Sequence, residues 1–155
     1  SEVLELVTAS RYLAENPRNQ PAMPSESSWG YKGFHEVWLE GANDWIYRHL
    51  HKASERMRDS AGKYSKVGAY GPMPLLTRAL NQMARELLLA ESSDWAFMMK
   101  TGQSAEYAVK RIQEHLLAFF RLYESVHRGN INESWLAGLE ERDNIFPDLD
   151  YHIYV

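Results

Sequence analysis

The sequence predicts an all-α protein, a helical bundle preceded by an irregular arm rich in aromatic residues. Long stretches of the 155-residue chain carry apolar residues every three or four positions, which is the spacing of an amphipathic helix. Capping residues, glycines and prolines mark the ends of these stretches. Apolar residues make up 45% of the chain, enough to bury one core in a domain of this length.

The bundle is expected to occupy residues 42–155. Apolar stripes and capping residues place helices at about 45–61, 74–92 and 104–127 and a short one after Asn132, with a helical turn at 94–99. A glycine-rich connection at residues 62–71 separates the first two helices. The tail from Ile145 to Val155 contains a proline and closely spaced aromatic residues, so we expect it to be extended.

Residues 1–41 are expected to form a connecting segment and an aromatic loop. The apolar segment Val3–Val7 could begin either a strand or a helix. Thr8 is suited to cap a short helix that Pro17 ends. Between Pro17 and Gly33 the chain contains three prolines and two glycines, which predicts irregular structure.

Trp29 and Trp38 lie in this arm, outside the helical stripes. An indole in such a loop either packs into a gap in the bundle or forms a platform for a flat ligand. Pyranose rings present C–H faces that stack on indoles, whose faces carry negative quadrupole charge. On composition alone the packing role is favoured.

The composition argues against several classes of function. With 21 acidic and 17 basic residues the net charge is −4, so we expect neither a nucleic acid nor a membrane surface as a partner. The chain has no cysteine, which rules out disulfides and thiolate metal sites and fits a cytoplasmic location. No apolar run approaches the roughly 20 residues that a membrane-spanning helix needs.

No catalytic or cofactor motif is present. A P-loop, a dinucleotide fingerprint, a nucleophile elbow and a His-Glu-x-x-His pattern are all absent, and we expect no cofactor and no metal. His51 and Glu55 share one helix face, where a solvated pair is the expected arrangement. Glycosidases need two carboxyl groups about 5–5.5 Å apart for retention or about 6.5–9.5 Å for inversion. The carboxylates of this chain lie in polar stretches, so no catalytic residue is expected in it.

A set of linked motifs runs through the chain in order. They are Ser27-Ser28-Trp29-Gly30, Val37-Trp38-Leu39, Asn43 to His51, Ser93-Asp94-Trp95, the series Tyr107, Arg111, His115 and Phe119, and Arg142 to Pro147. Together they resemble the C-terminal region of the 1,4-α-glucan (glycogen) branching enzymes of glycoside hydrolase family 57. The resemblance extends over essentially the whole chain.

The resemblance implies a C-terminal domain that packs on a (β/α)7 barrel absent from this chain. Enzymes of the family cleave an α-1,4-glucan and form an α-1,6 branch with retention, using carboxylates of the barrel. The helical domain closes one side of the cleft. The implied partners are therefore an α-glucan, such as amylose or glycogen, and the catalytic barrel of the same parent protein. The chain alone is expected to be inactive.

Three residues carry the expected substrate contacts. Trp29 and Trp38 match the cleft-lining tryptophans of the family, and Asp94 matches an acidic position near them. Asp94 could instead cap its helix and pair with Arg111. The alternative function is a free-standing helical module that binds a protein or a glucan without catalysis, although this leaves the aromatic arm unexplained.

Overall fold

A computed structural model describes residues 4–66 and 74–155, and within these ranges it contains helices and no strand. The α-helices are α1 (Ala9–Glu15), α2 (Trp45–Lys63), α3 (Leu75–Ala90), α4 (Ser93–Thr101), α5 (Ala105–Arg128) and α6 (Glu133–Arg142), and the 3₁₀ helices are η1 (Tyr31–Gly33) and η2 (Tyr151–Tyr154). The predicted all-α fold is confirmed. Residues 67–71 of the predicted glycine-rich connection lie outside the described residues, as does Val3. No described helix has the length and apolar character needed to cross a lipid bilayer.

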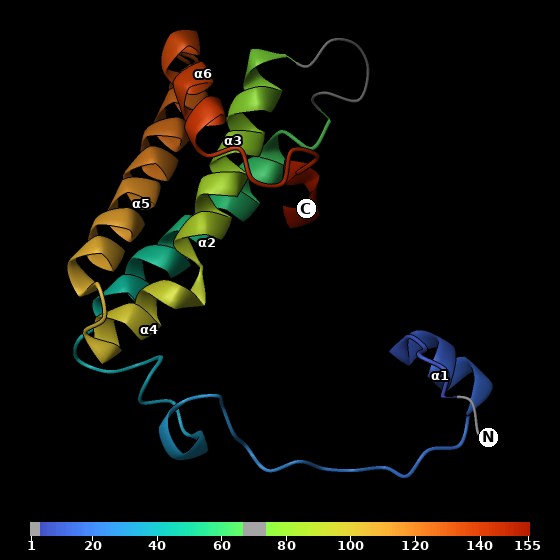
Figure 1. Cartoon of the computed structure of the whole chain (residues 1–155). Helices are drawn as coiled ribbons and strands as arrows, with labels where there is room; N and C mark the ends of the chain where they lie inside the picture. The colour runs from blue at the N-terminus through green and yellow to red at the C-terminus, as the bar shows by residue number, and fades with distance from the viewer. Residues whose placement is uncertain (1–3, 67–73) are drawn as a thin grey trace.

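Helix α3 is the central element of the bundle. It contacts α2, α5 and α6, and its most extensive contact is with α5, which runs beside it (Figure 1). The side chains that fill this interface are fully buried, and they include Leu80, Met83, Leu87, Ile112, Phe119 and Leu122. They occupy the apolar stripes that the sequence shows on each helix, so burial of these stripes is what holds the bundle together.

Local capping sets the ends of the helices. The side chain of Asn132 accepts a hydrogen bond from the Trp135 N–H at 2.9 Å, as predicted for the start of α6. Gly129 ends α5 in the left-handed conformation with φ 68°, which a residue without Cβ adopts freely. Ser104 occupies the predicted N-cap position of α5, but its side chain makes no capping hydrogen bond.

The C-terminal tail differs from the extended segment that we predicted. It turns into η2 and lies against the bundle near α2 and α3 (Figure 1). Tyr151 is fully buried, its hydroxyl donates to the Tyr64 carbonyl at 2.7 Å, and its N–H donates to Asn81 Oδ1 at 3.0 Å. The close aromatic spacing that suggested an extended tail instead reflects one buried ring within a 3₁₀ turn, and the Asp150 side chain caps this turn.

The arm before α2 projects away from the bundle (Figure 1). Thr8 caps α1 as predicted, since its hydroxyl accepts from the Arg11 N–H at 3.2 Å. However, no residue of α1 is buried, and within the described ranges α1 contacts no other helix. Large apolar side chains along the arm, such as Leu6 and Met23, are almost fully exposed. The arm therefore presents apolar surface that the bundle does not cover.

The packing of α5 on α3 leads to a prediction about stability. Phe119→Ala removes a fully buried ring and should lower the free energy of unfolding by about 3–5 kcal/mol. Leu117→Ala, on the same helix, alters a side chain that is 70% exposed and should change it by less than about 0.5 kcal/mol. Urea unfolding followed by circular dichroism measures both, and equal losses would contradict this account of the core.

Candidate functional site

Trp38 lies where the arm joins the bundle. Its half-buried ring packs on Phe97 of α4, with ring centroids 6.3 Å apart and ring planes inclined by 36°. The carbonyl of Trp38 accepts a hydrogen bond from the hydroxyl of Tyr47 in α2. Both the ring and the backbone of Trp38 are thus held by helices of the bundle.

The buried side chain of Asn43 joins the arm to α4 beside Trp38. Its amide nitrogen donates to the Val37 carbonyl at 2.9 Å and to the Ala96 carbonyl at 3.0 Å. Its amide oxygen accepts from the Glu40 N–H at 2.9 Å. All of these groups belong to the arm or to α4, so one amide links the residue before Trp38 to the residue before Phe97.

Trp29 lies in a turn that is closed by its own hydrogen bonds. The Ser28 N–H donates to the Gly33 carbonyl at 2.7 Å, and the Gly30 N–H donates to Ser28 Oγ at 2.9 Å. A Cβ at Gly30 would lie 2.0 Å from the Phe34 carbonyl oxygen, so only glycine fits there. The indole of Trp29 is 98% exposed. The packing role that composition favoured for Trp29 is therefore wrong in this structure.

Asp94 is exposed in the first turn of α4. Its Oδ2 accepts a hydrogen bond from the Ser92 hydroxyl at 3.1 Å. The predicted pair with Arg111 is not formed, because Arg111 interacts with Glu114 and Asp143 instead. Asp94 does not cap α4 either, since Ser92 occupies the N-cap position. A carboxylate in a first helical turn is favourable with the helix dipole.

The three predicted site residues are only partly brought together. Trp38 packs on α4, the helix that begins with Asp94, through Phe97. Trp29 lies farther along the arm, and among the described residues no hydrogen bond or ring contact joins it to Trp38 or Asp94.

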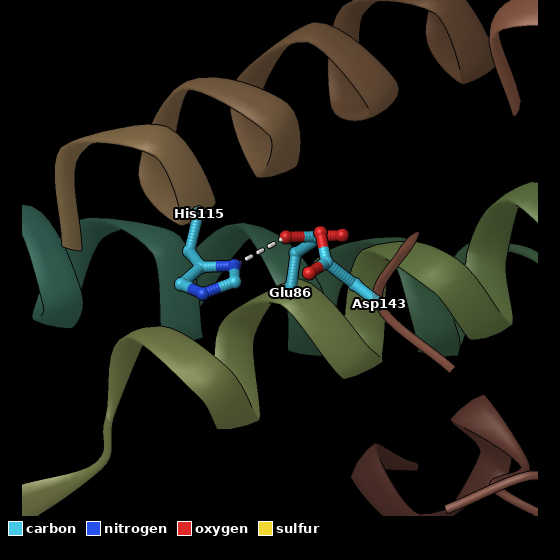
Figure 2. Close-up of side chains that lie close together, drawn as sticks. All are labelled: Glu86, His115 and Asp143. Carbon is cyan, nitrogen blue, oxygen red and sulfur yellow. Dashed lines mark hydrogen bonds and ion pairs between the residues drawn. The ribbon is translucent and has the colours of Figure 1, made fainter. Parts of the chain in front are cut away.

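A second polar cluster lies inside the bundle. Glu86 of α3, His115 of α5 and Asp143, which follows α6, are buried and converge on one another (Figure 2). His115 Nδ1 lies 2.7 Å from Glu86 Oε2. One potential ligand atom from each of the three side chains lies within 4.8 Å of the other two, so the cluster has to be considered as a metal site.

Hydrogen-bond partners indicate the tautomer of His115. Arg111 can only donate, and its guanidinium lies 3.0 Å from His115 Nε2, so Nε2 accepts and the ring proton sits on Nδ1. Nδ1 then donates to Glu86, whose other carboxylate oxygen accepts from Gln82 at 2.8 Å. Because both imidazole nitrogens are engaged, a metal ion would have to displace Arg111 or Glu86. The arrangement fits a closed hydrogen-bond network better than a set of metal ligands.

Two arginines balance the charge of Asp143. Arg142 donates to Asp143 Oδ2 from Nε at 2.9 Å and from its terminal nitrogen at 2.7 Å, and Arg111 lies 3.5 Å from Oδ1. Burial alone would raise the pKa of the Asp143 carboxyl. The hydrogen bonds and positive charge of Arg142 outweigh this effect and hold the pKa below its ordinary value of 3.8.

Sequence reasoning did not predict this network. The His-Glu-x-x-His pattern places its metal ligands on one helix, whereas Glu86, His115 and Asp143 come from three separate segments. One signal was present in the sequence, because His115 lies on the apolar stripe of α5 beside Ile112 and Phe119. A titratable residue on a buried stripe requires a polar partner from another helix.

Comparison with known proteins identifies the family. The profile described as "1,4-alpha-glucan branching enzyme, C-terminal" matches residues 49–154. This chain belongs to that family. A 1,4-alpha-glucan branching enzyme of Thermococcus kodakarensis is 36% identical over 98% of the chain, which covers 22% of that enzyme.

Solved structures of two related proteins match nearly the whole chain. The GH57-type branching enzyme of Pyrococcus horikoshii matches with a TM-score of 0.79 and 36% identity over 96% of this chain and 28% of its own. The α-amylase AmyC of Thermotoga maritima matches with a TM-score of 0.74 and 43% identity over 99% of this chain and 27% of its own. The family member described here therefore spans about a quarter of the length of these relatives.

The pKa of Asp143 leads to a prediction about acid stability. A carboxyl whose pKa is lowered by folding stabilises the protein above its unfolded pKa, and this contribution is lost as the pH falls through the folded pKa. Asp143→Asn should therefore flatten the fall in unfolding free energy between about pH 5 and pH 2, measured by urea titration. The exposed Asp148→Asn serves as the control and should keep the wild-type slope. An unchanged slope in Asp143→Asn would refute the role given to this carboxylate.

Proposed function

We propose that this chain is the C-terminal domain of a retaining α-glucan branching enzyme and that it lines one side of the glucan cleft. The observation that carries the proposal is the family match together with the placement of two indoles outside the core. Trp29 is 98% exposed on a turn that permits no side chain at Gly30, and Trp38 is held at the start of the bundle. Packing of the bundle does not explain an exposed indole on a hydrogen-bonded turn, whereas a ligand platform does.

The proposed chemistry of these residues is recognition and exclusion of water. The C–H faces of a glucosyl unit stack on Trp29 and Trp38. The carboxylate of Asp94 accepts a hydrogen bond from Ser92 and has acceptor capacity left for a sugar hydroxyl. A transferase must keep water from its glycosyl-enzyme intermediate, because water would hydrolyse it. Covering the acceptor side of a cleft serves that purpose.

The apolar surface of the arm supports a second part of the proposal. Leu4, Leu6 and Met23 are each at least 95% exposed, which is unfavourable in water. We propose that the catalytic barrel of the parent protein covers these apolar side chains in the connecting segment, residues 1–41, and that residues 42–155 form the helical domain. The relatives are about four times longer than this chain, so they have room for such a barrel. A cytoplasmic location remains part of the same proposal.

A second candidate activity is hydrolysis of an α-glucan. The observation that favours it is the 43% identity to a protein described as an α-amylase, the highest among the relatives given above. Hydrolysis and transfer share the same first step in a retaining enzyme and differ in whether water or a sugar hydroxyl takes the glycosyl group. A free-standing binding module without catalysis is the remaining alternative.

The proposed glucan contacts can be tested in the barrel-containing parent. Trp29→Ala and Trp38→Ala should each lower the rate of branch formation about 2- to 10-fold, as expected for the loss of one stacking contact. The melting temperature should change little in Trp29→Ala, because that ring is exposed. Tyr12→Ala removes another exposed aromatic residue of the arm and is the control. Unchanged branching in both tryptophan variants would remove them from the site.

The chain alone should not convert amylose. It contributes no pair of carboxylates that we assign to catalysis, so purified chain incubated with amylose should yield neither branches nor shorter glucans. Debranching followed by chain-length analysis detects the first product, and a reducing-end assay detects the second. Any turnover that follows the chain through purification would contradict the proposed division of labour between barrel and helical domain.

A further inference from the structure

We propose that Tyr47 and Asn43 are positioning residues that set the orientation of Trp38 for glucan. This inference rests on the function proposed above and adds two residues of α2 and its approach to the site. It concerns Trp38 alone, because Trp29 is held within its own turn.

Tyr47 acts on the backbone of Trp38. Its hydroxyl donates to the Trp38 carbonyl, while its half-buried ring packs against the hydrophobic core. Burial raises the pKa of the Tyr47 hydroxyl, so this group remains a donor at any physiological pH. The carbonyl that Tyr47 holds belongs to the same residue as the indole, so a change in this bond is transmitted through one Cα.

Asn43 acts on both sides of the ring pair. It is fully buried, and its amide nitrogen donates to Val37, directly before Trp38, and to Ala96, directly before Phe97. An amide with two donors can hold two carbonyls at once, which a carboxylate cannot do. The Trp38 and Phe97 rings therefore lie on two backbone segments that Asn43 ties together, and their ring planes are inclined by 36°.

A further contact closes the same junction. Lys100 Nζ of α4 pairs with Glu40 Oε2 of the arm at 3.2 Å. The hydrogen bond from the Ala42 N–H and the pair with Lys100 lower the pKa of the Glu40 carboxyl, so the pair stays ionised. Because Lys100 and Glu40 are partly exposed, this pair contributes little to stability compared with the buried amide of Asn43.

The alternatives to this inference are weaker. The buried cluster of Glu86, His115 and Asp143 has its nitrogen and oxygen atoms engaged by protein groups. Three shallow hollows along α5 share Leu117, but within the described residues no observed contact or charge pattern indicates a ligand or partner for them. Trp38 combines an expected ligand contact with hydrogen bonds from Asn43 and Tyr47 to its own backbone or to the neighbouring Val37.

The test uses this chain labelled with 5-fluorotryptophan, which gives one ¹⁹F resonance for each of the five tryptophans. Resonances are assigned by Trp→Phe substitutions. Tyr47→Phe, which removes only the hydroxyl, and Asn43→Ala should each shift and broaden the Trp38 resonance and leave that of Trp135 unchanged. Titration with maltoheptaose should then show a dissociation constant raised about 2- to 10-fold, as expected when a hydrogen bond that fixes a contact is lost.

Matched controls separate positioning from general stability. Tyr123→Phe removes the hydroxyl of a half-buried tyrosine in α5, and Asn81→Ala removes an amide that holds the tail through Tyr151. Asn81→Ala should lower the melting temperature without moving the Trp38 resonance. If Tyr47→Phe and Asn43→Ala leave that resonance unchanged in position and width, the positioning role is overturned.

The same experiment distinguishes the proposed glucan contact of Trp38 from the proposed positioning role of Tyr47 and Asn43. If maltoheptaose moves no tryptophan resonance of the wild-type chain while both substitutions disturb Trp38, the structural linkage stands, and the branching rate of Trp38→Ala in the barrel-containing parent decides the glucan contact. If maltoheptaose moves the Trp38 resonance and the two variants bind it as tightly as wild type, the contact stands and the positioning role fails.

Discussion

The hydrogen bond between His115 and Glu86 constrains the bundle more than any single apolar contact. Both side chains are completely buried, and an unpaired polar group in such an interior costs several times the net value of the bond it would make. Helices α3 and α5 must therefore meet in the one register that brings these atoms together. Apolar stripes alone would tolerate sliding by a turn, because leucine and methionine pack adaptably.

The same network extends beyond the two helices. Arg111 bonds His115 and lies beside Asp143, so the segment after α6 is tied to the α3–α5 interface. Arg85 of α3 then donates to the carbonyls of Ile145 and Phe146 at the start of the tail. The segment that leads to η2 is thus attached to the interface between α3 and α5, because Arg85 binds its backbone carbonyls. This attachment helps to place η2 and its buried Tyr151.

The sequence predicted the parts of the fold that depend on local patterns. The four main helices follow from their apolar stripes, and Thr8, Asn132 and Gly129 act at helix ends as expected. What it could not predict depends on segments distant in sequence. The buried Tyr151 forms hydrogen bonds with Tyr64 and Asn81, and Glu86 meets His115 across 29 positions. Periodicity within one element contains no information about such partners.

The candidate site shows the same division. Trp29 and Trp38 stood out because they lie outside helical stripes, and their residue type suggested a platform. Trp38 is held by α2 and α4, whereas Trp29 sits on an independent turn, and this difference depends on contacts that no local sequence pattern contains. Asp94 was interpreted from a motif, and its expected partner Arg111 instead pairs with Glu114 at 2.8 Å and lies 3.5 Å from Asp143.

The arm also determines how this chain would respond to a protease. Residues 11–27 are all exposed, and residues 16–25 belong to no helix, so their peptide bonds can enter a protease cleft without prior unfolding. The bundle from α2 onward offers no comparable stretch among its described residues. A cut between residues 16 and 25 would release α1 and leave the aromatic turn and the helical core as one fragment, which provides a direct route to a smaller domain for crystallisation.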